Sequence, residues 1–317
     1  MILGVDITER AVLDLVIATI PFATLLYLAA LGETIAEKAG VLNLGVEGMM
    51  AVGAVTGYIA GAASGSPWIG LAVGGLCGAA FSMIHALAAV ILGADQVVSG
   101  LALTILGLGF ADYIGADYTG DARRSWFVDV DLPVLTDLPW IGETVFAATP
   151  VTYLAILLGL CTWFVLHRTA LGLGIRAAGE SASTADAAGH SVVAIRVGAI
   201  AVGGALAGMS GAYLTNTLLG TSWNQGVTAG RGWIAVALVI FGAWRPGRVA
   251  IGAIVFGMTL ALQSRLPGFG IDFSPILMSM APFLMTILVL IVISYRARNK
   301  PSPAPAAIGI PYRREER

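Results

Sequence analysis

Nine apolar runs, separated by polar connections, follow one another along the chain. They cover residues 11–31, 46–63, 68–92, 97–114, 151–166, 192–214, 233–244, 249–262 and 275–294. A helix needs about 20 residues to cross the hydrocarbon core of a bilayer, and several runs reach that length alone. The runs are continuous rather than alternating, which disfavours a membrane barrel of strands. The pattern predicts an all-α, polytopic transmembrane helix bundle of about nine spans, within a range of roughly eight to ten.

Two of the runs, 233–244 and 249–262, are short for a crossing. They are broken or tilted helices, or they form a re-entrant pair. A glycine-rich polar lead precedes the apolar run at 40–58 ("GVLNLGVEGMMAVGAVTGY") and again at 230–247 ("GRGWIAVALVIFGAWRPG"), in opposite halves of the chain. Paired broken segments of this kind mark a midplane site in transporters built from repeats, and we treat this as a hypothesis.

Small residues recur at every fourth position in several runs. The rows are Gly53, Gly57, Gly61 and Gly65; Gly70, Gly74 and Gly78; and Gly204 with Gly208. Lipid offers no hydrophobic drive for helix association, so helices in a bilayer rely on close backbone approach and dispersion. The rows therefore predict a tightly packed bundle rather than a lone anchor.

Composition supports a membrane protein and gives no sign of an enzyme. The 317 residues are 57% hydrophobic and 11% charged, whereas soluble domains average about 45–50% apolar and about 25% charged. The mean hydropathy is +0.87. Cys77 and Cys161 lie inside apolar runs, so no disulfide framework or metal pattern is present. No Ser/His/Asp set, HExxH motif or GxxxxGK(S/T) loop occurs, so we expect no catalytic residue, metal, cofactor or nucleic-acid partner.

The distribution of charge predicts an orientation in the membrane. The connection 112–149 is acidic, whereas the connection 167–196 and the chain after Tyr295 carry more Arg and Lys than Asp and Glu. Lys and Arg gather on the cytoplasmic side of membrane proteins, which puts the N-terminus outside and the C-terminus inside. We expect one transmembrane domain, 1–300, with an external loop at 112–149 and a cytoplasmic loop at 167–196. Residues 301–317 are expected to form a disordered cytoplasmic tail, with a lipid head-group contact as the alternative.

A polar, glycine-rich passage at 31–55 ("LGETIAEKAGVLNLGVEGMMAVGAV") lies between two apolar runs. On the predicted topology, Glu33 and Glu37 fall in a cytoplasmic connection, four residues apart, while Asn43 and Glu47 begin the next span. A carboxylate at membrane depth is costly and should face protein or water. Irregular backbone there is tolerated only where it is buried in protein or lines a cavity. The passage is either a cavity-lining or gating segment, or an interfacial turn that caps a helix.

Four stretches of the chain resemble motifs of a known family. They are "GETIAEKAGVLNLGVEGMMAVGA" (32–54), "GADQVVSGLALTILGLG" (93–109), "HRTALGLGIRAAGESASTADAAGHSV" (167–192) and "TAGRGWIAVALVIFGAWRPGRVAIGAIVFG" (228–257). Together they resemble the inner-membrane permeases of the ABC importers for branched-chain amino acids, ribose and nucleosides, most closely the nucleoside and simple-sugar subgroup. Thr104 stands where that family often has Asn, and His190 stands where an apolar residue is commoner. These departures leave the family assignment intact and the substrate open.

The resemblance implies the membrane-spanning permease subunit of a bacterial ATP-driven importer, a multi-pass protein of the cell (inner) membrane. Its substrates would be nucleosides or simple sugars delivered by an external binding protein. It would pair with a second related permease, as a heterodimer surrounded by lipid. An ATP-binding cassette subunit would bind and hydrolyse the ATP. That subunit would receive a short coupling helix in the 167–196 loop, positioned by Arg176, Gly179, Glu180, Asp186 and Gly189.

The expected residues of the substrate pathway are Asn43, Glu47, Gln96, Trp223 and Asn224. An aromatic ring beside an amide suits stacking on a nucleobase or sugar, although Trp223 also fits an interfacial aromatic belt. Asp95, beside Gln96, is either a helix N-cap or a gate contact. Two other classes of function stay open. One is an ion- or proton-coupled transporter that titrates Glu47 or Asp95, and the other is a passive channel or scaffold.

Overall fold

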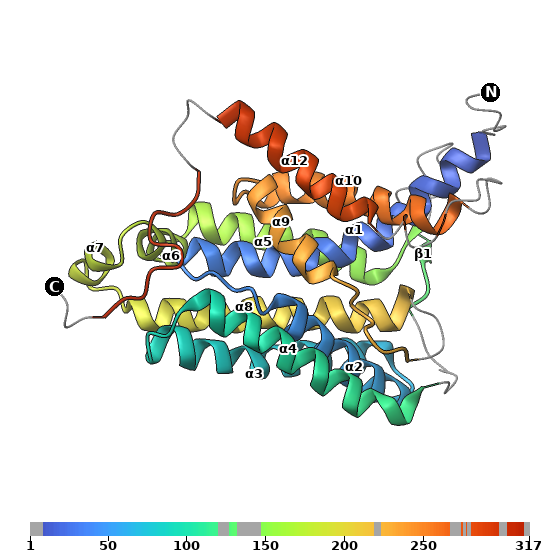
Figure 1. Ribbon diagram of the computed structural model, residues 1–317, viewed down its shortest axis with the longest axis horizontal. Helices are drawn as coiled ribbons and strands as arrows, with labels where there is room; N and C mark the ends of the chain where they lie inside the picture. The colour runs from blue at the N-terminus through green and yellow to red at the C-terminus, as the bar shows by residue number, and fades with distance from the viewer. Residues whose placement is uncertain are drawn as a thin grey trace.

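The structure is a computed structural model that describes residues 9–119, 127–131, 147–218, 223–266, 280–297 and 303–313, with residues 274 and 277. Its α-helices are α1 (Glu9–Lys38), α2 (Val46–Ser64), α3 (Pro67–His85), α4 (Gln96–Gly115), α5 (Pro150–Arg168), α6 (Ala170–Glu180), α7 (Ala182–Ala187), α8 (Val192–Tyr213), α9 (Arg231–Phe241), α10 (Pro246–Arg265) and α12 (Ala281–Ala297). Short turns of other helix types are η1 (Ala86–Ile91), η2 (Ala116–Tyr118) and η4 (Leu214–Leu218), and two strands, β1 (Val130–Asp131) and β2 (Ala147–Ala148), pair antiparallel. The long helices run along the horizontal axis of Figure 1, with α6 and α7 at one end and β1 at the other. We call these ends the α7 end and the β1 end.

Seven of the described helices are long and apolar enough to cross a membrane. They are α1, α2, α3 with η1, α4 with η2, α5, α8 with η4, and α10. The predicted all-α membrane bundle is confirmed, since each strand in the described part of the chain has only two residues. The apolar helices α9 and α12 have 11 and 17 residues and are shorter than a full span. The count of about nine spans and the orientation of the termini therefore stay predictions.

Helix α1 lies in the middle of the bundle. In Figure 1 it passes between a group containing α2, α3, α4 and α8 and a group containing α9, α10 and α12. It packs on both α8 and α10. Leu25, Leu26, Leu28 and Leu31 of α1 have no exposed surface and belong to the largest apolar cluster. Because α1 is covered on several sides, its last turns are available to hold the segments that surround it.

Glycines bring α2, α3 and α8 together at backbone distance. A Cβ atom added at Gly74 of α3 would lie 2.7 Å from the carbonyl oxygen of Gly53 in α2. One added at Gly208 of α8 would collide with the carbonyl oxygen of Gly74, and Gly78 meets Gly204 in the same way. The tight packing predicted from the rows of small residues is therefore confirmed for these three helices.

The end of the chain differs from its prediction. The sequence predicted a disordered tail at 301–317, but residues 303–313 lie against the α7 end (Figure 1), and we call them the C-terminal strap. The Ala307 N–H donates to the Gly179 carbonyl at 2.8 Å, and Pro305 and Ala307 are buried. Composition alone suggested too little apolar surface to order this segment. The surface that it needs is supplied by distant helices, and proline has less backbone freedom to lose on ordering.

The glycine packing predicts that Gly208→Val destabilises the protein by about 1–3 kcal/mol or more, because the new side chain overlaps the backbone of α3. The measurement is the thermal unfolding of the purified protein in mild detergent. Gly198→Val is the matched control on the same helix, since a Cβ at Gly198 meets no atom within 4 Å. Equal melting temperatures for the two variants would contradict the backbone contact.

Candidate functional site at the meeting point of two broken segments

The chain between α1 and α2 enters the bundle before it becomes helical. Residues 39–45 leave the end of α1, and the Leu44 carbonyl accepts a hydrogen bond from Thr104 Oγ1 at 2.8 Å. A Cβ atom at Gly100 would lie 2.8 Å from the Leu44 nitrogen. Since α4 begins at Gln96, Thr104 lies about two turns along it. Helix α2 therefore starts inside the bundle, at some depth from its α7 end.

The chain before α9 enters the bundle from the opposite end. Trp223 lies against Gly115, the last residue of α4, and the Gly226 N–H donates to Asp112 Oδ1 at 3.0 Å. Helix α9 then runs for only 11 residues toward the α7 end. Helix α10, with 20 residues, qualifies as a span alone. Of the two alternatives for these short runs, the structure contains a broken helix followed by a complete one.

The two broken segments meet at Glu47. Its side chain is 3% exposed, and Oε1 accepts from the Gly230 N–H at 2.8 Å while Oε2 accepts from the Gly232 N–H at 2.6 Å. The first N–H groups of a helix have no partner within the helix. Gly230, the residue before α9, has φ of 80° and no side chain to cap it. A carboxylate from another segment supplies that cap, where the positive end of the helix favours a negative charge.

Arg231 adds a positive charge at the same place. Its Nη1 donates to the carbonyl oxygens of Val227 at 3.0 Å and Thr228 at 3.3 Å. The guanidinium thus closes the turn that leads into α9. The start of α9 therefore combines a buried carboxylate, a half-buried cation and the helical N–H groups that the carboxylate caps, which is a polar junction inside an apolar bundle.

A pair of further carboxylates, Glu33 and Glu37, holds both broken segments near the α7 end. Glu33 Oε1 accepts from the Asn43 N–H at 3.0 Å, and Glu37 Oε2 accepts a short hydrogen bond from Trp244 Nε1, just beyond α9. Each glutamate is 1% exposed, and its other oxygen has no hydrogen-bond partner among the described residues. The connection begins later than predicted, because α1 continues to Lys38 and both side chains are buried, while the side of the membrane stays a prediction. The sequence signal for this longer helix was the four-residue spacing of Glu33 and Glu37, with no Gly or Pro between Glu33 and Gly40.

Three of the five predicted pathway residues gather around residues 39–47. Asn43 is fully buried, and its Oδ1 accepts from the Gly45 N–H at 3.1 Å. Gln96, 1% exposed, accepts from the Leu42 N–H through Oε1 at 2.8 Å. Glu47 lies at the end of this passage. Side-chain hydrogen bonds from Glu33, Asn43 and Gln96 thus hold the passage inside the protein, and its predicted role as a cavity-lining or gating segment stays a prediction.

The other two predicted pathway residues lie elsewhere, near the β1 end. Trp223 is fully buried, with its ring centroid 6.1 Å from that of Tyr58. Tyr58 also lies edge-on to Tyr118 at 6.3 Å. Asn224 is exposed. The tryptophan therefore packs against other aromatic side chains in this structure, and neither residue reaches the junction at Glu47.

The short helix predicted between Gly179 and Gly189 is present as α7, and its coupling role stays a prediction. Ser181 precedes it, and the Ser181 hydroxyl accepts from the Thr184 N–H at 3.4 Å. The residues predicted to position it are placed around it: Arg176 and Gly179 in α6, Glu180 at the end of α6, Asp186 in α7, and Gly189 with φ of 88° after it. The sequence did not predict α6, an 11-residue helix whose start is capped by the Thr169 hydroxyl.

The end of α6 is in contact with the passage that leads to the junction. A Cβ atom at Gly179 would collide with the carbonyl oxygen of Lys38, and one at Gly40 would lie 2.9 Å from Arg196 Nη2. Arg196 is 1% exposed, and its Nε donates to the Ala39 carbonyl at 3.3 Å. The sequence analysis did not single out this arginine, although a lone cation just inside an apolar run was a signal. A shift of α6 would therefore displace the start of residues 39–45.

The buried polar side chains of the site serve to hold neighbouring segments together. Within the described ranges, no group of three or more His, Cys, Asp or Glu side chains is placed to hold a metal ion. The buried carboxylates accept hydrogen bonds from backbone and indole N–H groups. Such bonds hold segments in place and can be exchanged for others when the segments move.

Known proteins match the chain over nearly its whole length. A family model described as the branched-chain amino acid transport system / permease component matches residues 15–293. TsgC13 from Haloferax volcanii, provisionally assigned as a glucose ABC transporter permease protein, is 40% identical over 94% of this chain and 97% of its own. The guanosine ABC transporter permease protein NupQ from Bacillus subtilis is 36% identical over 93% and 95%. The nucleoside ABC transporter permease protein NupC from Lactococcus lactis is 31% identical over 92% and 94%.

The cap on α9 predicts that Glu47→Ala lowers the free energy of unfolding by about 1–3 kcal/mol for each buried N–H group left without an acceptor. Glu47→Gln keeps one acceptor oxygen, so we expect an intermediate loss. Thermal unfolding in mild detergent is the measurement. Asp95→Ala is the matched control, because Asp95 accepts from the Val98 N–H at 2.8 Å as an exposed cap of its own helix. That loss should be about 1 kcal/mol, and an unchanged melting temperature for Glu47→Ala would contradict the buried cap.

Proposed function

The chain belongs to the family of branched-chain amino acid transport system permease components, and on that premise we propose that it forms the pathway for nucleosides or simple sugars in an ATP-driven importer. It is a multi-pass membrane protein and a permease component of an ABC transporter. Its substrate is delivered from outside by a binding protein. The bacterial cell (inner) membrane is the proposed location, with the N-terminus outside and the C-terminus inside.

The single observation that carries the pathway proposal is the way α9 is held. Glu47 caps the start of this half-length helix, and Glu37 binds Trp244 just beyond its end. Both carboxylates come from other segments, so α9 has two separable attachments. Broken helices that meet near the middle of a bundle form the substrate sites of transporters built from repeats. A substrate that binds more tightly when α9 has shifted drives the change of state by that difference in affinity.

The polar groups around the junction suit a neutral, hydroxyl-rich substrate. Gln96 Nε2 and Thr228 Oγ1 are buried and have no hydrogen-bond partner among the described residues. Together with Asn43 and Glu47, they offer donors and acceptors of the kind that sugar hydroxyls use. The names of the relatives, which refer to glucose, guanosine and nucleosides, point to the same chemistry. Trp223 and Asn224 remain candidates only for a state in which the β1 end has opened.

The α7 end is the proposed contact with the ATP-binding subunit, which binds and hydrolyses the ATP. The coupling residues are Arg176, Gly179, Glu180, Asp186 and Gly189. Their motion reaches the pathway through the contact of α6 with the start of residues 39–45. A second, related permease completes the pathway as a heterodimer. The proposed external loop, 112–149, would meet the binding protein, and most of it lies outside the described residues.

A coupled transporter that titrates Glu47 or Asp95 is not favoured. Both carboxylates accept backbone N–H groups as helix caps, Glu47 for α9 and Asp95 for α4. The capping role therefore accounts for both residues without proton transport.

A detergent pull-down from the native membrane should recover an ATP-binding subunit with this chain. Replacement of residues 179–189 by a flexible linker should abolish that recovery, because it removes α7. The control is an equal replacement of residues 132–142 in the proposed external loop. Uptake of labelled guanosine, in competition with unlabelled nucleosides, ribose and glucose, then defines the substrate. A chain recovered without any ATP-binding subunit would contradict the importer.

Trp244→Phe should change uptake with little effect on assembly. It removes the indole N–H that Glu37 binds, and a hydrogen bond to a charged group contributes about 1.5–3 kcal/mol. We expect about a tenfold change in uptake rate at equal expression, since each 1.4 kcal/mol corresponds to about a factor of ten. Trp163→Phe is the matched control, because Trp163 is 44% exposed on α5. Equal uptake by both variants would argue against α9 as the moving part.

A further inference from the structure

The C-terminal strap crosses the α7 end of the bundle from one side to the other. Pro303 lines a hollow with Trp244 and Lys38, next to α9 and α1. At the other end of the strap, the side chain of Arg313 lies beside Gly93, in the connection between α3 and α4. The strap therefore lies next to the α9–α10 connection at one of its ends and next to the α3–α4 connection at the other. Figure 1 shows it passing along these two helices toward the C-terminus.

Hydrogen bonds attach the strap along its length. The Ala306 N–H donates to Glu180 Oε2 at 3.4 Å, and the Ala307 N–H donates to the Gly179 carbonyl at 2.8 Å. Arg196 Nη1 donates to the Ile310 carbonyl at 2.9 Å. A buried guanidinium is unfavourable unless acceptors surround it. Ile310 supplies one of those acceptors, so the strap gives the Arg196 guanidinium a hydrogen-bond partner that the helices do not supply.

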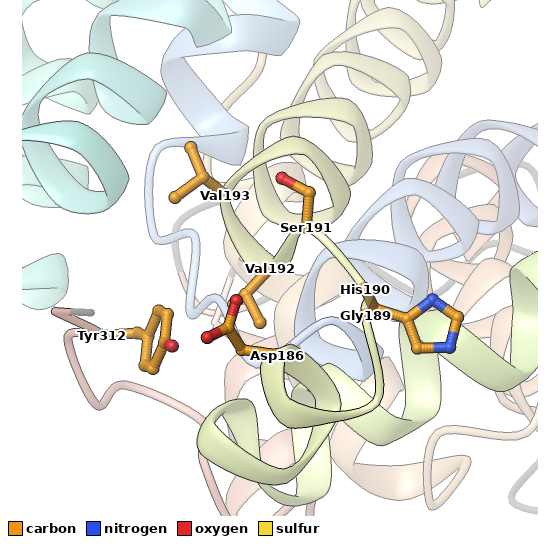
Figure 2. Close-up of a pocket in the computed structure, with 7 residues that line it drawn as sticks. All are labelled: Asp186, Gly189, His190, Ser191, Val192, Val193 and Tyr312. Atoms are coloured by element: carbon orange, nitrogen blue, oxygen red, sulfur yellow. The ribbon is translucent and has the colours of Figure 1, made fainter. Parts of the chain in front are cut away.

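Tyr312, Asp186 of α7 and the connection from α7 into α8 form the walls of one pocket. It has a volume of about 240 Å³ and is lined by Asp186, residues 189–193 and Tyr312. Figure 2 shows the Tyr312 ring on one side, the Asp186 carboxylate facing it, and Val192 and Val193 above. The ring rests on the apolar cluster of Ala178, Ala182, Ala185 and Val192, which fixes its position. Without the strap, this pocket would have only one wall.

The pocket has the size and chemistry of a seat for one long side chain. It is smaller than the roughly 300–1,000 Å³ of small-molecule sites. The Tyr312 hydroxyl is buried and has no hydrogen-bond partner among the described residues. The valines offer an apolar path for the stem of a side chain, and the Asp186 carboxylate favours a cationic head by charge. A cation over the tyrosine ring adds a further attraction.

We propose that the strap is the second half of the docking surface for the ATP-binding subunit, and that a basic side chain of that subunit enters the pocket between α7 and Tyr312. The proposal rests on the proposed function and extends it, because the pocket is continuous with the coupling helix. Its occupant is the ATP-binding subunit, since α7 lines the same pocket. The attachment of the strap to Arg196, which also binds Ala39, joins this docking surface to the passage that leads to Glu47.

The test measures the affinity of the purified ATP-binding subunit for the full-length permease in detergent. Tyr312→Ala should weaken that affinity about tenfold, as expected for a buried aromatic anchor at an interface. Tyr312→Phe keeps the ring, so we expect a smaller loss. Removal of residues 303–317 should weaken binding more than either. Melting temperatures of the permease alone should stay unchanged for the two point variants.

Two controls separate the strap from nonspecific effects. Removal of residues 314–317 alone should leave the affinity unchanged. Tyr113→Ala removes a tyrosine that is 80% exposed on α4, toward the β1 end, and should also change nothing. Replacement of residues 179–189 by a linker should abolish binding, because it removes α7 itself.

The outcomes distinguish this proposal from the proposed function. Loss of binding with the 179–189 linker but full affinity for Tyr312→Ala and for the strap deletion would overturn the proposal and leave the importer intact. Loss of self-association in Tyr312→Ala, with full affinity for the ATP-binding subunit, would assign the pocket to a second copy of the chain and overturn it too. A wild-type permease that binds no ATP-binding subunit would overturn both.

Discussion

The carboxylate of Glu47, at the start of α2, holds the start of α9 beside it, and the arrangement of both broken segments depends on this contact. A buried carboxylate is unfavourable without donors, and the first N–H groups of a helix are unfavourable without acceptors. The carboxylate supplies the acceptors that the N–H groups need, and the N–H groups supply the donors that the carboxylate needs. The contact is possible because Gly232 has no side chain: a Cβ atom there would lie 2.6 Å from the backbone of Glu47. Gly48 allows α4 an equally close approach, so the start of α2 is enclosed on both sides.

At the α7 end, buried polar side chains also hold separate segments together, through different partners. Glu37 binds Trp244, and Arg196 binds Ala39 and the strap, so buried charges again join segments that are distant in sequence. These contacts are hydrogen bonds, so each side chain can bind another polar partner when the segments move. Between these contacts, α6 touches the end of α1 at Gly179. Packed segments therefore run without a break from α7 through α6 to the passage that leads to Glu47.

The sequence by itself determined the membrane class, the approximate positions of the seven long apolar helices and the existence of two broken segments. These properties are local: the length of an apolar run, the four-residue spacing of glycines such as Gly204 and Gly208, and the polar breaks around residues 40 and 230 are all visible in short windows. The quoted motifs also led to the family that the match over residues 15–293 shows. The short helix bounded by Gly179 and Gly189 was equally visible, since it needs only its own cap.

Only the tertiary structure decided which polar groups are buried and which segments they join. Hydropathy ended the first helix near residue 31, yet Glu33 and Glu37 continue it, because Asn43 and Trp244 supply donors that no local window contains. Trp223 read as a possible substrate platform, but neighbouring aromatic rings cover it. The strap read as disordered because the guanidinium and the apolar surface that order it come from other helices. Burial of charge depends on partners distant in sequence, and those partners are brought together only by the packed bundle.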